Sequence, residues 1–291
     1  MRTAILTAPQ SARKEPAVEN LDRRVAVVTG ASTGIGRAIA RSFVEQGMRV
    51  VLASQNPHRL DDAVAELAAD GAPVLGIPTD VSDEVQIQAL ADATIAEFGQ
   101  IDVVVNNAGV FAPGYAWELT REDWEWVVGV NLWGPIHAMR VFVPLLFERP
   151  EGHVVNVSSA GGLMPARVHA PYCTTKHGVI GLSKALRADL ELKGANVGVT
   201  VVCPGAVVTA ITSQIANTGP GGVPRGSVDL PPEVEAVWDG INTFTDAGIP
   251  ADDVGAMVVD AIRTNRFWVM PNAEVFFPVF EQELADLKAQ R

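Results

Sequence analysis

Short runs rich in valine and isoleucine alternate with segments of helical spacing along most of this chain. The run "RRVAVVTG" (23–30) is apolar and ends in glycine, and "IGRAIARSFVEQG" (35–47) then places Ile35, Ile39 and Phe43 at helical spacing. Such apolar strands, separated by helices, are typical of a parallel sheet covered by helices on both faces. The pattern therefore predicts an α/β fold, a three-layer doubly wound parallel sheet in a single domain.

The same alternation extends over the rest of the chain. It predicts further strands at "MRVVLAS", "PVLGIPTD", "IDVVVNNAG", "GHVVNVSS", "VGVTVVCPG" and "RFWVMP", with helices at 59–71, 84–99, 124–148, 170–192 and 251–262. After Thr209 the chain becomes rich in glycine and proline, which indicates a substrate loop over about 210–250. We expect a flexible N-terminal arm at 1–20, one domain over 21–275 and a C-terminal tail at 276–291.

Composition narrows the classes of partner. A chain of 291 residues that is 48% hydrophobic can bury a sizeable core, and its formal net charge of −12 would repel a phosphate backbone. We therefore expect no nucleic acid partner. The absence of an apolar run of membrane-spanning length predicts no membrane association. Two cysteines, Cys173 and Cys203, are too few for a disulfide scaffold, so we expect a cytoplasmic protein.

A glycine turn follows the first predicted strand, in "TGASTGIG". Gly30, Gly34 and Gly36 would let the backbone approach a pyrophosphate at the N-terminus of the next helix, as in Rossmann-like folds. Small and polar residues also end the later strands, where sheets of this kind bind ligands. These are Thr79 and Asp80, Asn106 to Gly109, Asn156 to Ser159, and Pro204 with Gly205. The sequence thus predicts a dinucleotide site along this edge of the sheet.

Tyr172 is one of only two tyrosines, and Lys176 follows it by four positions. On a helix this spacing places a phenol and an ammonium group on one face. A nearby positive charge favours the phenolate, so we expect Lys176 to lower the pKa of Tyr172 and to make the pair an acid and base near neutrality.

The end of the second strand usually selects between the two nicotinamide cofactors, because an acidic residue there repels a 2′-phosphate. Here Ser54 occupies that place in "VVLASQN", and Arg37, His58 and Arg59 lie close in the sequence. We expect NADP rather than NAD, with NAD left open.

Six motifs occur in order: "TGASTGIG", "NNAG", "VNLWG", "NVSSAGG", "YCTTK" and "PGAVVT". With them the chain resembles the short-chain dehydrogenase/reductase family, in its compact one-domain branch, from about Arg24 to Met270. The resemblance implies that Tyr172 is the proton donor and acceptor, Lys176 its partner, Ser159 the catalytic serine and Asn131 the residue that steadies a proton-relay water. It also implies a cofactor site formed by Gly30, Ser32, Thr33, Gly34, Ile35, Gly36, Ser54, Asp80, Val81, Asn107, Ala108, Gly109, Tyr172, Lys176, Pro204, Gly205, Val207 and Thr209.

The substrate is less constrained than the reaction. Between 210 and 250, Arg225 is the only cation against five carboxylates, while Ile211, Ile215, Trp238 and Phe244 are apolar, so we expect a neutral, apolar or aromatic secondary alcohol or ketone. Parts of the chain are similar to family members that oxidise benzylic alcohols of lignin-type aryl ethers. The alternatives are a 3-ketoacyl reductase, a dinucleotide-binding regulatory protein on the same fold, and a sugar-nucleotide epimerase on a related fold.

Two further expectations concern aromatic residues and histidines. Trp124, Trp126 and Trp133 surround the fifth helix, which the family often uses for subunit contact, so core packing and assembly into a homodimer or homotetramer both explain them. His137, His153, His169 and His177 are scattered without metal-ligand spacing, and we expect no metal site and no role for them.

Overall fold

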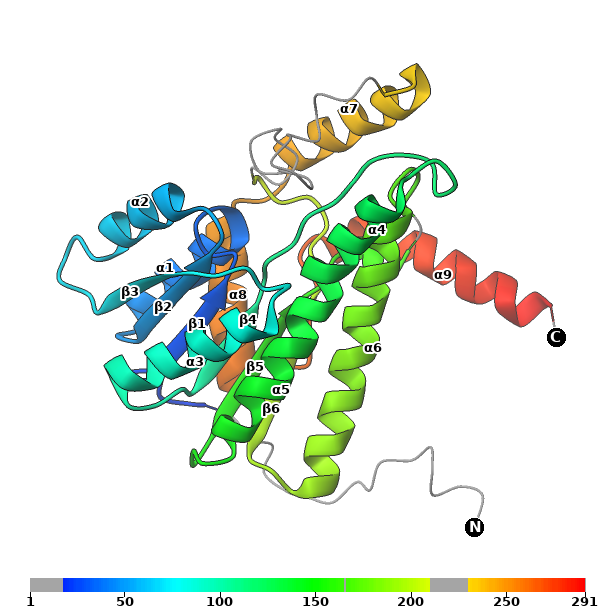
Figure 1. The fold of residues 1–291 in the computed structure, drawn as a ribbon. Coiled ribbons are helices and arrows are strands. Elements are labelled where there is room, and N and C mark those ends of the chain that lie inside the picture. Colours follow the sequence, from blue (N-terminus) through cyan, green and yellow to red (C-terminus); the bar gives the residue numbers. More distant parts are fainter. Residues whose placement is uncertain (1–17, 165, 210–229, 291) are drawn as a thin grey trace, which may run out of the picture.

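A seven-stranded parallel sheet runs through the computed structural model, which describes residues 18–164, 166–209 and 230–290. The strand order is β3-β2-β1-β4-β5-β6-β7 (Figure 1). The strands are β1 (Val25–Thr29), β2 (Arg49–Ser54), β3 (Val74–Pro78), β4 (Val103–Asn106), β5 (Gly152–Val157), β6 (Val197–Val202) and β7 (Trp268–Val269). The predicted doubly wound α/β fold is confirmed. Because every pairing is parallel, all carboxyl ends of the strands lie at one edge of the sheet.

Helices cover both faces of the sheet. Helices α1 (Gly34–Glu45), α2 (Pro57–Leu67) and α8 (Ala251–Thr264) pack on one face, and α3 (Glu84–Phe98), α5 (Gly134–Leu146) and α6 (Ala170–Lys193) pack on the other. Alternation along the strands separates the two cores: in β1, Ala26 and Val28 join the first core and Val27 joins the second. Strands buried on both sides explain why their sequences read as nearly continuous runs of valine.

The segment predicted as one long helix over 124–148 has three parts. Helix α4 (Arg121–Val128) begins with a capping box, in which Thr120 and Asp123 each accept a hydrogen bond from the other's backbone N–H. A π-helical turn, Gly129–Trp133, follows and leads into α5.

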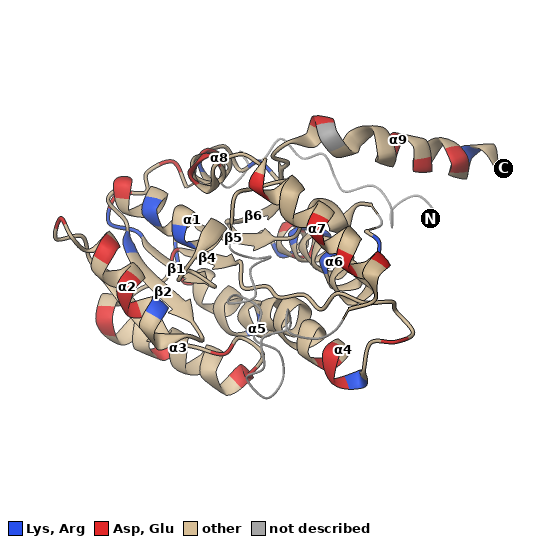
Figure 2. Ribbon diagram, turned by 90° about the horizontal axis from the view of Figure 1, so that it is seen from above, with Lys and Arg blue, Asp and Glu red and all other residues tan. Residues whose placement is uncertain are grey.

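Two further helices were not predicted from the sequence. Helix α7 (Pro232–Asp246) occupies the described part of the expected substrate loop, and α9 (Ala273–Ala289) occupies the expected C-terminal tail. Figures 1 and 2 show α9 extending away from the body of the molecule. The expected N-terminal arm up to residue 17, and residues 210–229 with Ile211, Ile215 and Arg225, lie outside the described residues.

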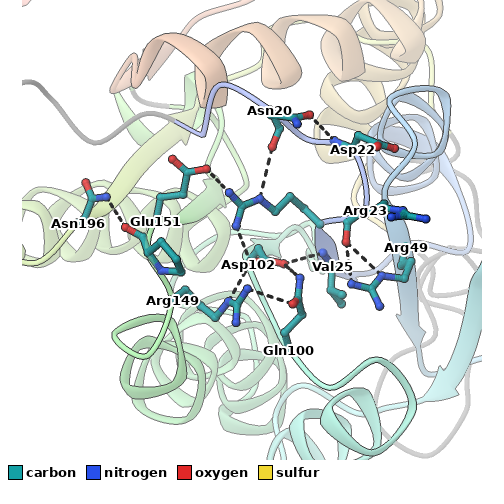
Figure 3. Close-up of polar contacts among 12 residues, drawn as sticks. Asn20, Asp22, Arg23, Val25, Arg49, Gln100, Asp102, Arg149, Glu151 and Asn196 are labelled. Atoms are coloured by element: carbon teal, nitrogen blue, oxygen red, sulfur yellow. Dashed lines mark hydrogen bonds and ion pairs between the residues drawn. The ribbon is translucent and has the colours of Figure 1, made fainter.

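A buried carboxylate and its charged partners link the loops at the amino ends of β1, β4 and β5 (Figure 3). The Asp102 carboxylate is fully buried and accepts hydrogen bonds from Val25 N at 2.8 Å, Arg24 Nη1 at 3.2 Å and Arg149 Nε at 3.0 Å. Glu151 also pairs with Arg24. A carboxylate with this many donors keeps its charge without water, so it fixes β1, β4 and the loop before β5 relative to one another.

Charge on the outer surface is mainly acidic. Figure 2 shows Asp and Glu on the outward turns of α2, α4, α7 and α9. None of the helices in the described ranges combines the length and the apolar composition that a membrane span requires.

Candidate active site

A cavity of about 490 Å³ opens at the carboxyl edge of the sheet. The turn after β1, the ends of β2, β4, β5 and β6, the start of α6 and part of α7 line it. It is the place where a doubly wound sheet binds a ligand.

The glycine turn forms the floor of one half of the cavity. Gly30 has a φ of +63°, and a Cβ there would lie 2.7 Å from Ala108 Cα. A Cβ on Gly36 would lie 2.4 Å from Asn107 Nδ2 and 2.5 Å from Gly30 O. Thr33, which precedes α1, makes no side-chain cap hydrogen bond within the described chain. The first N–H groups of α1 are thus available to a phosphate, and these residues fit a dinucleotide pyrophosphate.

The adenosine end of this half lies beyond β2. Ser54 Oγ and Ser32 Oγ are 2.8 Å apart, and Gln55 Nε2 donates to Asp80 Oδ2 at 2.9 Å. Arg59, in the first turn of α2, also lines the cavity. A cation together with two hydroxyl groups is a donor set that a 2′-phosphate can use.

Tyr172 and Lys176 lie on one face of α6 at the centre of the cavity. Lys176 is buried; its Nζ donates to Val157 O at 2.9 Å and lies 5.5 Å from the centroid of the Tyr172 ring. Ser159 makes a side-chain hydrogen bond with Tyr172, and its Oγ also accepts from Gly161 N at 3.1 Å. The structure therefore brings the phenol, the hydroxyl and the amine together. Ser158 instead donates to Lys176 O, which holds the helix against β5.

Burial dominates the pKa values of this pair. It raises the pKa of Tyr172 to about 12, which the Ser159 hydrogen bond only partly offsets, and it lowers the pKa of Lys176 to about 8. The expectation that Lys176 depresses the pKa of Tyr172 is therefore wrong for this structure. Loss of water around a buried phenolate disfavours the charged form and raises the pKa of the phenol. The phenol is accordingly a proton donor at neutral pH.

Asn131 lies in the π-helical turn and is buried. Its Nδ2 donates to Val110 O and its Oδ1 accepts from Val110 N, both at 2.8 Å. A Cβ on Gly109 would lie 3.4 Å from Lys176 Nζ and 3.6 Å from Asn131 Oδ1, so the amide and the amine border the same glycine. Asn131 thereby holds the chain after β4 next to Lys176.

The other half of the cavity is apolar and aromatic. Phe111 packs edge-on against Tyr172, with ring centroids 5.4 Å apart. The remaining lining residues of this half include Trp126, Met164, Ala166, Ile241 and Phe244. Together with Phe111 they come from four separate segments, and for this reason sequence reasoning misses most of them. Core packing and assembly are the two explanations that the sequence offers for Trp126, and it lines the cavity instead.

Nearly all predicted site residues lie around this one cavity. Those lining it are Gly30, Ser32, Thr33, Gly34, Ile35, Ser54, Asp80, Val81, Asn107, Ala108, Gly109, Ser159, Tyr172, Lys176, Pro204, Gly205, Val207 and Thr209. Gly36 and Asn131 stand one layer behind, where Gly36 faces the Asn107 amide and Asn131 faces Val110.

Comparisons with known proteins agree with this geometry. The family model for short chain dehydrogenases matches residues 24–219. A 1-deoxy-11-beta-hydroxypentalenate dehydrogenase from Streptomyces exfoliatus is 34% identical over 258 residues, which cover 88% of this chain and 85% of that protein.

Two solved structures are also similar. A short chain dehydrogenase/reductase from Burkholderia phymatum in complex with NAD is 35% identical with a TM-score of 0.88, covering 94% of this chain and 96% of that one. A variant of the actinorhodin polyketide ketoreductase with NADPH is 32% identical with a TM-score of 0.72, covering 86% of this chain and 96% of that one.

Proposed function

Because the chain belongs to the short-chain dehydrogenase family, as an NAD(P)-dependent oxidoreductase, we propose that it interconverts neutral aromatic or apolar ketones and their secondary alcohols, with Tyr172 as general acid and base. One observation supports this proposal most directly. Tyr172 and Ser159 are hydrogen-bonded to each other and lie beside the aromatic half of the cavity, where Phe111 contacts the Tyr172 ring.

The roles of the polar residues follow from their positions. When bound, the nicotinamide ring supplies or accepts the hydride. In reduction, Tyr172 Oη gives its proton to the carbonyl oxygen as negative charge develops there, and the Ser159 hydroxyl donates a hydrogen bond to the same oxygen. Lys176, which donates to Val157 O, lies with its Nζ 5.5 Å from the centroid of the Tyr172 ring and places an amine beside the phenol that loses the proton. In oxidation the same phenolate accepts the proton of the alcohol.

The lining of the substrate half supports a neutral substrate. Among the described residues there, Phe111, Trp126, Met164, Ala166, Ile241 and Phe244 carry no charge. The first turn of α7, the helix that contributes Ile241 and Phe244 to the lining, carries the acids Glu233 and Glu235, and Tyr115 donates to Glu233 at 3.2 Å. A carboxylate or phosphate on the substrate would lose hydration there without gaining a cationic partner from the described lining of this half.

A matched pair of ketones tests the substrate class. Loss of absorbance at the reduced-nicotinamide band would be followed with acetophenone and with 4-carboxyacetophenone, which differs by one negative charge. We expect kcat/KM to favour the neutral ketone by about tenfold or more. A preference for the acid would contradict the proposal and favour the alternative of a 3-ketoacyl reductase. Tight cofactor binding without turnover of any ketone would favour the regulatory protein instead.

We propose NADP as the preferred cofactor. Ser32, Ser54 and Arg59 line the adenosine end, where an acidic residue would exclude the 2′-phosphate. Dissociation constants measured by fluorescence should be lower for NADPH than for NADH. Arg59→Gln should weaken NADPH binding by about tenfold and leave NADH binding unchanged. Arg37→Gln is the matched control, because Arg37 pairs with Glu66 at 3.3 Å and does not line the cavity. Equal or tighter NADH binding by the parent protein would refute this preference.

We also propose that the protein is cytoplasmic and that it self-associates. Both cysteines are free thiols, which suits a reducing compartment such as the cytoplasm. Self-association into a homodimer or homotetramer is supported by Trp133 and Phe147, which flank α5 and are 48% and 39% exposed. Light scattering of the protein and of Trp133→Glu tests it; a monomeric parent protein would refute it.

A further inference from the structure

His169 lies at the start of α6, three residues before Tyr172, and lines the substrate half of the cavity. It is only 4% exposed. Its ring packs edge-on against Phe111, with centroids 5.3 Å apart, and is stacked with Trp238 of α7 at 5.7 Å. Phe111 contacts the Tyr172 ring as well, so the imidazole and the phenol share one aromatic neighbour.

The hydrogen bond at Nδ1 determines the tautomer of this imidazole. Nδ1 lies 2.7 Å from Arg167 O, and a carbonyl oxygen can only accept, so Nδ1 carries the hydrogen. In the neutral ring, Nε2 is then an acceptor. Burial lowers the pKa of His169, so the neutral ring is the form present at pH 7.

Nε2 is buried and has no hydrogen-bond partner among the described residues. An unpaired buried acceptor is unfavourable, and natural proteins keep such groups chiefly where a ligand or an ordered water completes them. Because Phe111 and Trp238 pack on the imidazole, a molecule that reaches it must be apolar or aromatic there. The partner that suits Nε2 is therefore a hydrogen-bond donor on such a molecule.

We propose that His169 is a specificity-determining residue, whose Nε2 accepts a hydrogen bond from a hydroxyl group that the substrate carries on its aromatic ring, away from the reacting carbonyl. The inference rests on the proposed ketone reductase function and narrows its substrate to hydroxyaryl ketones and the corresponding alcohols. His169 would position the ring, while Tyr172 transfers the proton.

The test compares ligands that differ in one hydrogen-bond donor. The 2-, 3- and 4-hydroxyacetophenones would be titrated into the cofactor-loaded protein and compared with their methyl ethers and with acetophenone, with binding followed by protein fluorescence. At least one hydroxyl isomer should bind about tenfold more tightly than its ether, because only the hydroxyl can satisfy Nε2. KM should show the same preference.

Two substitutions at His169 separate hydrogen bonding from packing. His169→Phe keeps an aromatic ring without an acceptor and should reduce the hydroxyl preference to within about twofold. His169→Gln offers an amide oxygen and should restore part of it. His177→Gln, on the exposed side of the same helix, is the control and should keep the full preference.

Two results would overturn the inference: no hydroxyl isomer preferred by the parent protein, or an undiminished preference in His169→Phe. Turnover of all the ketones without a hydroxyl preference would refute the role of His169 but leave the proposed function standing. Tight cofactor binding without binding or turnover of any ketone would remove the proposed function as well.

Discussion

Acidification from pH 7 to pH 5 should destabilise this protein through His153. The residue lies fully buried in β5, where its Nε2 is 2.8 Å from Thr200 Oγ1. Thr200 in turn donates to Arg266 O, so it accepts from the imidazole and Nε2 carries the hydrogen. Nδ1 has no partner within the described chain, and no described acid lies near enough to stabilise a second proton.

The size of the effect follows from the pKa difference between the folded and unfolded states. Burial lowers the pKa of His153 from 6.5 to about 3. The stabilising contribution of the neutral ring is therefore complete above pH 6.5 and is lost as the pH falls toward 3, since the unfolded chain binds the proton first. Each pH unit below that point removes about 1.4 kcal/mol, so the free energy of unfolding should drop by about 2 kcal/mol between pH 7 and pH 5 from this residue alone.

Urea unfolding at constant ionic strength, at pH 7 and at pH 5, measures this loss. Carboxylates contribute to the pH dependence too, so the comparison is with His153→Gln, whose amide can still donate to Thr200 and does not titrate. The variant should lose about 2 kcal/mol less than the parent protein over the same range. His58→Gln, at an exposed position of α2, should behave as the parent does. If the His153 variant and the parent lost equal stability, the reasoning from burial would be refuted.

Three other outcomes follow from the contacts described above. Tyr172→Phe should keep its affinity for the cofactor and lose about a hundredfold or more in kcat, measured by reduced-nicotinamide absorbance; a near-normal kcat would end the assignment of this residue. Asp102→Ala should lower the free energy of unfolding by about 3–5 kcal/mol, because it leaves Arg24 and Arg149 without their shared carboxylate, and a loss below about 1 kcal/mol in urea would speak against that role. Gly36→Ala should raise the Kd for NADPH about tenfold or more by pushing Asn107 from the glycine turn, and unchanged affinity by fluorescence titration would contradict the tight packing seen there.

The parts of the site that the sequence predicts are those with a local signature. The glycine turn needs small residues at fixed offsets after a strand, and Tyr172 and Lys176 need only one helical turn between them. The parallel sheet is equally readable, because strands buried on both faces must be apolar throughout.

Helices α7 and α9 were not predicted because their sequences contain residues that usually break helices. Helix α7 begins at the second of two consecutive prolines and contains Gly240, while α9 contains Pro278. A proline in the first turn is compatible with a helix, which explains α7, but Pro278 lies inside α9. Tertiary position, rather than local preference, decides such segments.

The electrostatics of the site could not be predicted from spacing. The separation between Tyr172 and Lys176 suggests a depressed phenol pKa, yet the depth of burial decides the direction of the shift, and burial depends on the whole fold. The role proposed for His169 departs from the expectation of no role for a related reason. That role depends on the Arg167 carbonyl and on the rings of Phe111 and Trp238, which come from two distant segments. No sequence motif indicates these contacts.

The number of residues in the π-helical turn at Gly129–Trp133 should matter for catalysis, because this turn positions Asn131. Such a turn holds one residue more than the α-helical turn it replaces. Deleting a single residue there would allow a continuous α-helix from α4 to α5 with the residues on either side still in register, but it would remove the wide turn that directs the Asn131 side chain to Val110. Asn131 would then leave Val110, although no side chain facing the substrate had been changed. Length variation at this point should therefore be as damaging to catalysis as a substitution at Tyr172, whereas extra residues at the far end of α9 should be tolerated.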